Sequence, residues 1–185
     1  MNAYVELVIA FPLLMAMLQF ALLGTFGDAI SHWFVQRAFS VPFNLSTALA
    51  KMIEWALLAI CIKYAFLGFN GFIDILVAKG YLPELNVFTR ALSISIAMNL
   101  QFGPFLVIAH RYLDNLIVKE NNWSNMDKAL KSLIWFWIPA HTVTFMLPKP
   151  YQIGLAALWS IVLAVILGVY KRQALTAQQA QGHAN

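Results

Sequence analysis

Long apolar runs alternate with short polar connections along the whole chain. A helix needs roughly 20 residues to cross a ~30 Å hydrocarbon core, and five of the runs reach about that length. They are residues 3–27, 47–69, 88–110, 129–147 and 151–170. Because lipid cannot satisfy backbone polar groups, segments of this kind fold as helices. The pattern predicts an all-α fold, a polytopic transmembrane helical bundle with about five spans.

The fourth apolar run has a proline in its interior, in the stretch WIPAHTVTFMLPKP. Pro139 lacks an amide hydrogen and clashes with the carbonyl four residues earlier, so we expect a proline-kinked fourth helix with one free carbonyl. His141, Thr142 and Thr144 are the nearby side chains able to satisfy loosened backbone groups. A re-entrant fourth run would leave four spans, but five spans is the preferred prediction.

Composition supports the membrane interpretation. Of the 185 residues, 61% are hydrophobic and only 11% are charged, whereas soluble domains carry roughly a quarter charged residues. We expect residues 1–172 to form a single transmembrane helical domain in the lipid bilayer and the polar residues 173–185 to form a flexible tail. The net charge of +4 is not concentrated in blocks, which argues against nucleic acid as a partner.

Lys and Arg are distributed unevenly between the two sides of the predicted bundle. With five spans, one side collects Arg37, Lys51, Arg111, Lys119, Lys128, Lys131, Lys171 and Arg172. The other side has only Lys79, Arg90 and Lys149. Because basic loops face the cytoplasm, the N-terminus is predicted to lie outside and the C-terminus inside. With four spans, the excess of Lys and Arg would be smaller but would remain on the same side.

Two titratable residues lie deep in the predicted spans. Glu54 is about seven residues, or roughly 10 Å, from the inner end of the second span. A carboxylate at that depth must be protonated, hydrated or matched by another helix, and is a functional candidate by default. His141 lies near mid-depth in the fourth span, where a neutral hydrogen-bonded imidazole and a titrating gate are both compatible with the sequence.

Two His and Asp pairs lie at the inner ends of the first and third spans. Asp28 precedes His32 by four residues, and His110 precedes Asp114 by four. Side chains one helical turn apart face one another, so ordinary interfacial ion pairs are expected. A metal site or proton relay is the alternative, but no spacing fixes the distance between the two helices. No metal or cofactor is predicted.

Small residues recur every fourth position in the last span, at Ala156, Ser160, Ala164 and Gly168. Such a stripe lets another helix approach closely. The third span carries Ala91, Ser95 and Asn99 at the same spacing. These faces indicate tight packing, and the alternative is a pore lined by Ser95, Asn99 and Gln101. The full set assigned to a pore or polar network is Glu54, Asn99, Gln101, Pro139, His141 and Thr144.

Four motifs occur along the chain: GDAIS at 27–31, GFNGFID at 68–74, MNLQFGP at 98–104 and WIPAHTVTFMLPKPYQ at 137–152. In order and spacing they resemble motifs of the Mpv-seventeen and peroxisomal membrane protein family. The resemblance covers residues 12 to about 170, and its first and last motifs are the more specific ones. It implies a small helical protein of an inner or organellar membrane, without a cofactor. Some members of the family resemble weakly selective channels.

The chain also departs from the family pattern. Ile138 is inserted between the Trp and the Pro of the last motif. His141 and Thr144 stand where the family usually shows Gln and Asn, and Gln152 stands where it usually shows Arg. The resemblance therefore indicates a distant member. Because the short chain shows no organelle-targeting extension, we expect a bacterial inner membrane.

The sequence favours a weakly selective channel or permeation path for ions or small solutes. The alternative is a structural or accessory protein whose small-residue stripe packs against a membrane partner or a second copy of the chain. An enzyme is not expected. No nucleophile has a base at recognisable spacing, and neither a glycine-rich phosphate loop nor a Cys/His metal pattern occurs.

Overall fold

Helices are the only regular secondary structure in the part of the chain that the structure describes. The computed structural model describes the backbone of residues 2–182 and the side chains of residues 2–166, 168, 169 and 172. In chain order the elements are α1 (Ala3–Ala10), α2 (Pro12–Gln36), α3 (Leu45–Ala78), α4 (Val87–Gln101), α5 (Gly103–Val118), α6 (Met126–Ser132), the π-helical turn η1 (Leu133–Trp137), α7 (Ile138–Met146) and α8 (Lys149–Gly182). Over the described residues, the predicted all-α fold is confirmed.

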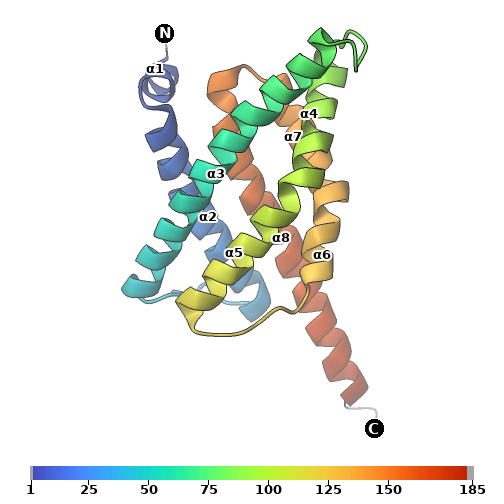
Figure 1. Cartoon of the computed structure of the whole chain (residues 1–185). Helices are drawn as coiled ribbons and strands as arrows, with labels where there is room; N and C mark the ends of the chain where they lie inside the picture. The colour runs from blue at the N-terminus through green and yellow to red at the C-terminus, as the bar shows by residue number, and fades with distance from the viewer. Residues whose placement is uncertain (1, 183–185) are drawn as a thin grey trace.

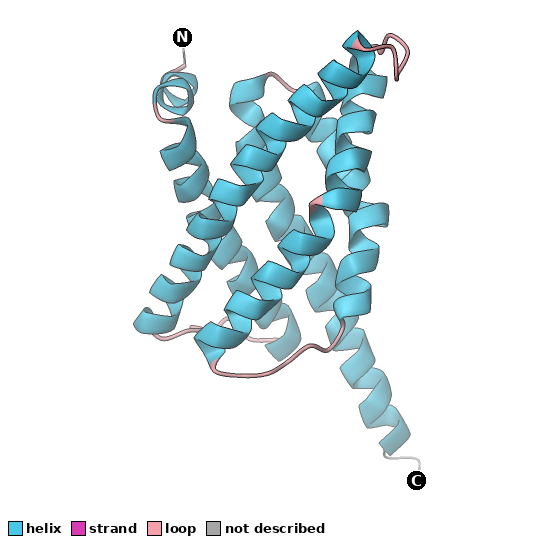
Figure 2. Cartoon of the chain, in the orientation of Figure 1, coloured by secondary structure: helices cyan, strands magenta, loops and turns pink. Residues whose placement is uncertain are grey.

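The chain runs back and forth along the length of the bundle (Figure 1). After the short α1, helix α2 leads to the opposite end and α3 returns. The α4–α5 pair leads away again, α6, η1 and α7 return, and α8 ends the chain far from the N-terminus. The connecting loops gather at the two ends, apart from a break between α4 and α5 (Figure 2).

Asparagine side chains fix where the long helices begin. The Asn44 side chain accepts a hydrogen bond from the Thr47 amide at 2.8 Å, and Asn86 accepts one from Thr89 at 2.9 Å. Both satisfy amide groups that lack a partner inside the helix. Helix α2 ends at Arg37, which has a left-handed backbone conformation with φ of 56°. The loops at each end therefore follow from local sequence.

Among the described residues, fewer helices qualify as membrane spans than the sequence predicts. Helices α2, α3 and the Lys149–Ile166 part of α8 are long and apolar enough to cross a membrane. Helices α4 and α5 qualify as a pair, bent by 48° at their break, which brings the number to four. The predicted fourth run, residues 129–147, is divided among α6, η1 and α7, each of which is too short to qualify alone.

Large apolar side chains cover the outside of the bundle, and several polar side chains are buried inside it beside an apolar core. Large apolar side chains form exposed stripes at one-turn spacing, including Leu14, Leu18, Leu22 and Phe26 on α2 and Leu49, Ile53 and Leu57 on α3. The interior holds the polar side chains Lys51, Glu54, Ser95, Asn99, His141, Thr142 and Thr144. Exposed apolar stripes of this extent mark a surface that contacts a membrane or another protein. The arrangement therefore supports a membrane location.

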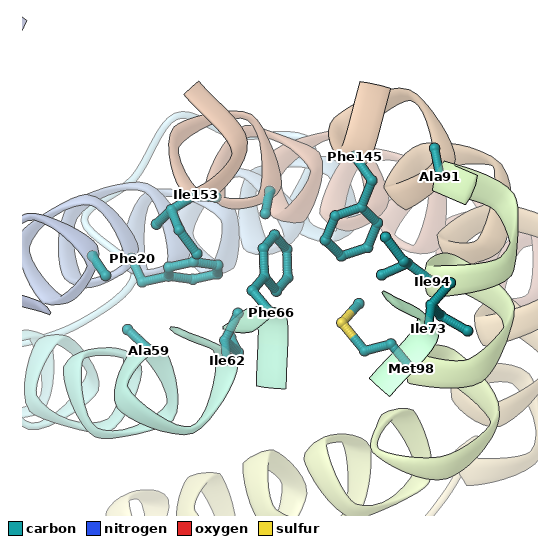
Figure 3. Packing of buried hydrophobic residues seen from close by; sticks show 13 residues of the cluster. Phe20, Ala59, Ile62, Phe66, Ile73, Ala91, Ile94, Met98, Phe145 and Ile153 are labelled. Carbon is teal, nitrogen blue, oxygen red and sulfur yellow. The ribbon is translucent and has the colours of Figure 1, made fainter. Parts of the chain in front are cut away.

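An apolar core joins five of the helices. Phe66 of α3 lies at its centre, with Phe20 and Ile153 on one side and Phe145 and Ile94 on the other (Figure 3). The rings of Phe66 and Phe145 lie 4.7 Å apart between centroids. These residues belong to α2, α3, α4, α7 and α8, so one cluster connects most of the long helices.

The irregularity predicted at Pro139 takes the form of a π turn. Pro139 is the second residue of α7, which directly follows η1, and the Ile138 amide between them donates to the Leu133 carbonyl five residues earlier. A π turn shifts the register of backbone hydrogen bonds by one residue, next to a residue that has no amide hydrogen to donate. The kink itself stays a prediction.

The segment predicted as a flexible polar tail begins inside α8. The backbone of α8 continues as a helix through Gly182. Most of the segment 173–185 is therefore a continuation of the last helix, and residues 183–185 lie outside the described residues. Its flexibility stays a prediction.

Gly24 is required by the close approach of α2 and α3. A Cβ atom at Gly24 would lie only 2.6 Å from two indole carbons of Trp55, while at Gly68 it would meet nothing within 4 Å. We expect Gly24→Ala to lower the free energy of unfolding by about 1–3 kcal/mol through overpacking. Gly68→Ala, the matched control, should change it by less than about 1 kcal/mol. Thermal unfolding in detergent, followed by circular dichroism, measures both, and equal losses would contradict this packing.

Candidate functional site

A partly buried group of charged residues joins three helices near one end of the bundle, with Lys51 and Glu54 buried and the other members half-buried. It consists of Asp28 on α2, Lys51 and Glu54 on α3, and His110 and Asp114 on α5, and is called the Lys51 cluster below. The Lys51 Nζ atom donates to Asp28 Oδ2 at 3.2 Å and to Asp114 Oδ1 at 2.5 Å. The Lys51 side chain is 6% exposed. One ammonium therefore links α2, α3 and α5 through two carboxylates.

Aromatic residues enclose the ammonium and its carboxylate partners. Trp55 Nε1 donates to Asp28 Oδ2 at 3.2 Å, so this oxygen accepts from two donors on α3. The Phe43 ring, from the loop before α3, lies 5.2 Å from Lys51 Nζ, within range of a cation–π interaction. These contacts fix the position of Lys51, which is expected for a charge removed from water.

Glu54 has a different environment from the two aspartates. Its carboxylate is buried, and neither oxygen has a hydrogen-bond partner. His110 Nε2 lies 3.7 Å from Glu54 Oε1, too far for a hydrogen bond, and also has no partner. The His110 ring packs on Trp55 with centroids 4.6 Å apart. Glu54 and His110 thus face each other as an incompletely satisfied acid and base.

The sequence pattern places these residues together once the helices are paired. Lys51, Glu54 and Trp55 occupy positions i, i+3 and i+4, which share one helix face. Asp28 and Asp114 lie within about two turns of the ends of α2 and α5 at the same side of the bundle. From the sequence, Lys51 was assigned only to the basic residues of the inner side, and its pairing with the aspartates was not predicted. Its position three residues before Glu54 was the available signal.

The ion pairs predicted within single helices are replaced by contacts between helices. Asp28 contacts Lys51 and Trp55, and among the described residues His32 forms no hydrogen bond or ion pair. Asp114 contacts Lys51, while His110 faces Glu54. The Lys51 ammonium contacts both carboxylates, so the packing of three helices overrides the local one-turn pairs.

A second polar group lies between α4 and α7 and is fully satisfied. Asn99 Nδ2 lies 3.1 Å from His141 Nδ1 and donates to the Ser95 carbonyl at 2.8 Å. Ser95 Oγ donates to the Ile138 carbonyl at 2.7 Å. His141 stacks on Trp137 with ring centroids 4.9 Å apart. The face predicted as a pore lining is thus covered by α7, and its hydrogen bonds hold the two helices together.

The remaining residues of the predicted network do not converge on one path. Thr144 is buried, donates to the Ala140 carbonyl and accepts from Trp159 Nε1 at 3.1 Å. Gln101 and Pro139 are exposed.

Glu54 and His141 lie in different parts of the bundle. Phe66, which packs on His141, is about 18 Å further along α3 than Glu54 at 1.5 Å per residue. Ala59 and Ile62 of the apolar core lie on α3 between them.

The small-residue stripe of α8 packs within the chain. A Cβ atom at Gly27 of α2 would lie 3.5 Å from the Ser160 carbonyl oxygen and 3.6 Å from Ala164 Cβ. One at Gly168 would meet Ser31 and Phe34 of α2. Helix α2 therefore occupies the surface on which the accessory-protein alternative depends.

No family model, curated protein or solved structure matches this chain. Among the described residues, no group of three or more His, Cys, Asp or Glu side chains is arranged to hold a metal ion. Lys51 lies between two carboxylates of the Lys51 cluster, and His110 faces the third. The geometry therefore suits ion pairing and proton exchange.

Replacing Lys51 tests how far the stability of the bundle depends on its ammonium group. Lys51→Met leaves the half-buried Asp28 and Asp114 without their partner, and we expect a loss of about 3 kcal/mol in the free energy of unfolding, at the lower end of the cost of breaking a buried ion pair. The matched control is Lys131→Met, since Lys131 forms an exposed pair with Asp127 at 3.5 Å and such pairs contribute about 0–1 kcal/mol. Denaturant unfolding in mixed micelles compares the two. Similar losses for both variants would show that the Lys51 cluster is not a structural centre.

Proposed function

We propose that this protein is a five-span membrane protein that provides a permeation path for protons or small cations through the Lys51 cluster. The observation that carries the proposal is the buried Glu54 carboxylate, which has no hydrogen-bond partner and faces the unpartnered His110. A buried ionisable group without a partner in a membrane protein is costly and marks ion or proton pathways by default. The cost is removed when the carboxylate binds a proton or a cation.

The charge balance of the cluster favours positive permeants. Three carboxylates, from Asp28, Glu54 and Asp114, lie in a cluster that holds a single ammonium. Lys51 is engaged with the two aspartates, which leaves Glu54 and His110 to exchange a proton or hold a cation. An anion would meet an excess of negative charge in a medium of low dielectric constant.

Five spans account best for the path of the chain. The helical run α6–η1–α7 extends from Met126 to Met146, about 30 Å at 1.5 Å per residue, which matches a hydrocarbon core. With α2, α3, the α4–α5 pair and α8, this makes five passages and puts the termini at opposite ends. The short pieces of the fourth passage reflect the π turn before Pro139.

The orientation follows from the basic residues. The end of the bundle where α2 ends and α3 begins also carries the α5–α6 loop and the last turns of α8 (Figure 1). It therefore collects most of the Lys and Arg side chains, which supports a cytoplasmic position for this end. The N-terminus would lie outside and the C-terminus inside. A bacterial inner membrane and distant membership of the Mpv-seventeen family remain proposals that rest on the motif resemblance.

The proposal includes neither an enzymatic activity nor a cofactor. The accessory-protein alternative has lost its motivating observation, because α2 packs against Gly168 and the Ser160–Ala164 part of the stripe. A partner or a second copy would have to use another surface.

Cysteine accessibility tests the topology. In a Cys61→Ala background, Lys149→Cys should react with a membrane-impermeant maleimide added outside intact cells. Ser124→Cys should react only after permeabilisation, because the five-span arrangement places the two loops on opposite sides. Labelling of both positions from the same side would support a re-entrant α6–α7 segment and contradict five spans.

Flux measurements test the function. Purified protein in liposomes that enclose a pH-sensitive dye should dissipate an imposed proton gradient faster than empty liposomes. Glu54→Gln should reduce this flux at least tenfold, since the amide has nearly the same shape but cannot exchange a proton. Replacing sodium with potassium or choline in the buffer tells cation flux from proton flux.

Asp127→Asn is the matched control, because Asp127 is an exposed carboxylate paired with Lys131 and should not affect the flux. Wild-type flux no greater than that of empty liposomes, between about pH 5 and 8, would refute the proposed function. Equal flux in wild type and Glu54→Gln would remove the Lys51 cluster from the path.

A further inference from the structure

Helix α5 is the least embedded of the long helices. Its only buried residues are Gly103 at its start and Asn115 near its end. The apolar side chains between them form an outward stripe of Phe105, Ile108, Tyr112 and Leu116, each about half exposed. In a membrane this stripe faces lipid, which offers no packing preference for one helix position over another.

Polar contacts hold the second half of α5 to the rest of the bundle. Asp114 pairs with Lys51, and His110 packs on Trp55 and faces Glu54. Asn115 is buried, and its Nδ2 atom has no hydrogen-bond partner. Leu106 packs against the apolar core near the start of α5, and the second half of α5 contacts α3 through the Asp114–Lys51 pair and the His110 ring on Trp55.

The first residue of α5 lies at an irregular point of the bundle. Helix α4 ends at Gln101, and α5 begins at Gly103 with a bend of 48°. Gly103 packs directly on Leu133, the first residue of the π turn, where a Cβ atom would lie 2.8 Å from Leu133 Cδ2. Pro104 follows and removes one backbone hydrogen bond across the break. Breaks of this kind absorb the dihedral changes of a hinge.

We propose that α5 is a gate that rotates about Gly103 and opens the Lys51 cluster at the end of the bundle where α5 terminates. The Asp114–Lys51 ion pair keeps α5 against α3 and is called the latch below. Its release would move Asp114 and His110 away from α3 and expose Glu54 to water from that side. The gate rests on the proposed function, because it assigns the entrance of the same path, although the motion can be measured without any flux.

The geometry of a hinge predicts unequal movement along α5. At 1.5 Å per residue, position 116 lies about 20 Å from Gly103 and position 105 about 3 Å from it. A rotation of about 10° moves position 116 by about 3–4 Å and position 105 by about 0.5 Å. The C-terminal end of α5 is therefore expected to move, while the end next to Gly103 stays in place.

Spin-label distance measurements in lipid nanodiscs test the gate. In a Cys61→Ala background, one label at the exposed Leu22 of α2 is paired with a second label at Leu116 or at Phe105. Asp114→Asn weakens the latch with little change in shape and is less disruptive than Lys51→Met. We expect the Leu22–Leu116 distance distribution to gain a component displaced by at least 3 Å in Asp114→Asn, while the Leu22–Phe105 distribution stays unchanged.

Asp127→Asn serves as the control and should leave both distributions unchanged. Superimposable Leu22–Leu116 distributions in wild type and Asp114→Asn would overturn the gate. So would equal shifts at both positions, which indicate general loosening of the bundle. Failure of the gate leaves the loss of flux in Glu54→Gln as the test of the proposed function. Absence of wild-type flux together with the predicted displacement would retain the hinge and reject the permeation path.

Discussion

The arrangement of the three helices around the candidate site depends on one ammonium group held between two carboxylates. Lys51 draws Asp28 of α2 and Asp114 of α5 to the same face of α3. In an apolar surrounding, an unpaired member of this set would cost several kcal/mol, so the three helices are constrained to meet at the depth where their charges lie. Trp55 and Phe43 enclose the pair and exclude other partners.

The two buried polar groups of the bundle differ in how completely they are satisfied. Asn99, His141 and Ser95 use their hydrogen-bonding groups between α4 and α7, one of them on the Ile138 carbonyl next to the π turn. The group of Asn99, His141 and Ser95 holds α7 against α4 next to the π turn. Glu54 and His110 leave polar atoms unpartnered instead. A satisfied network stabilises structure, whereas an unsatisfied acid and base retain the capacity to take up an ion.

The long helices also differ in how closely they pack on their neighbours. Helix α8 approaches α2 through small residues at Gly27, Ala164 and Gly168, and α4 lies against α7 through hydrogen bonds. Helix α5 has neither kind of contact along its middle. Because lipid provides no hydrophobic drive for one helix to pack on another, the polar contacts at the far end of α5 carry more of its attachment than they would in water. The helix that borders the unsatisfied carboxylate is also the one held most loosely.

The sequence by itself determined that the chain is helical, that most of it suits a membrane, that charges gather at one end, and that the helix around Pro139 is irregular. These properties depend on composition, on depth at 1.5 Å per residue and on local backbone chemistry. Only the tertiary structure decided that Asp28 and Asp114 pair with Lys51 and not with His32 and His110. It also decided that α2 covers the small-residue stripe of α8. Depth along a helix can be read from residue number, but the choice of neighbouring helix depends on how all the helices pack, and no local spacing specifies that.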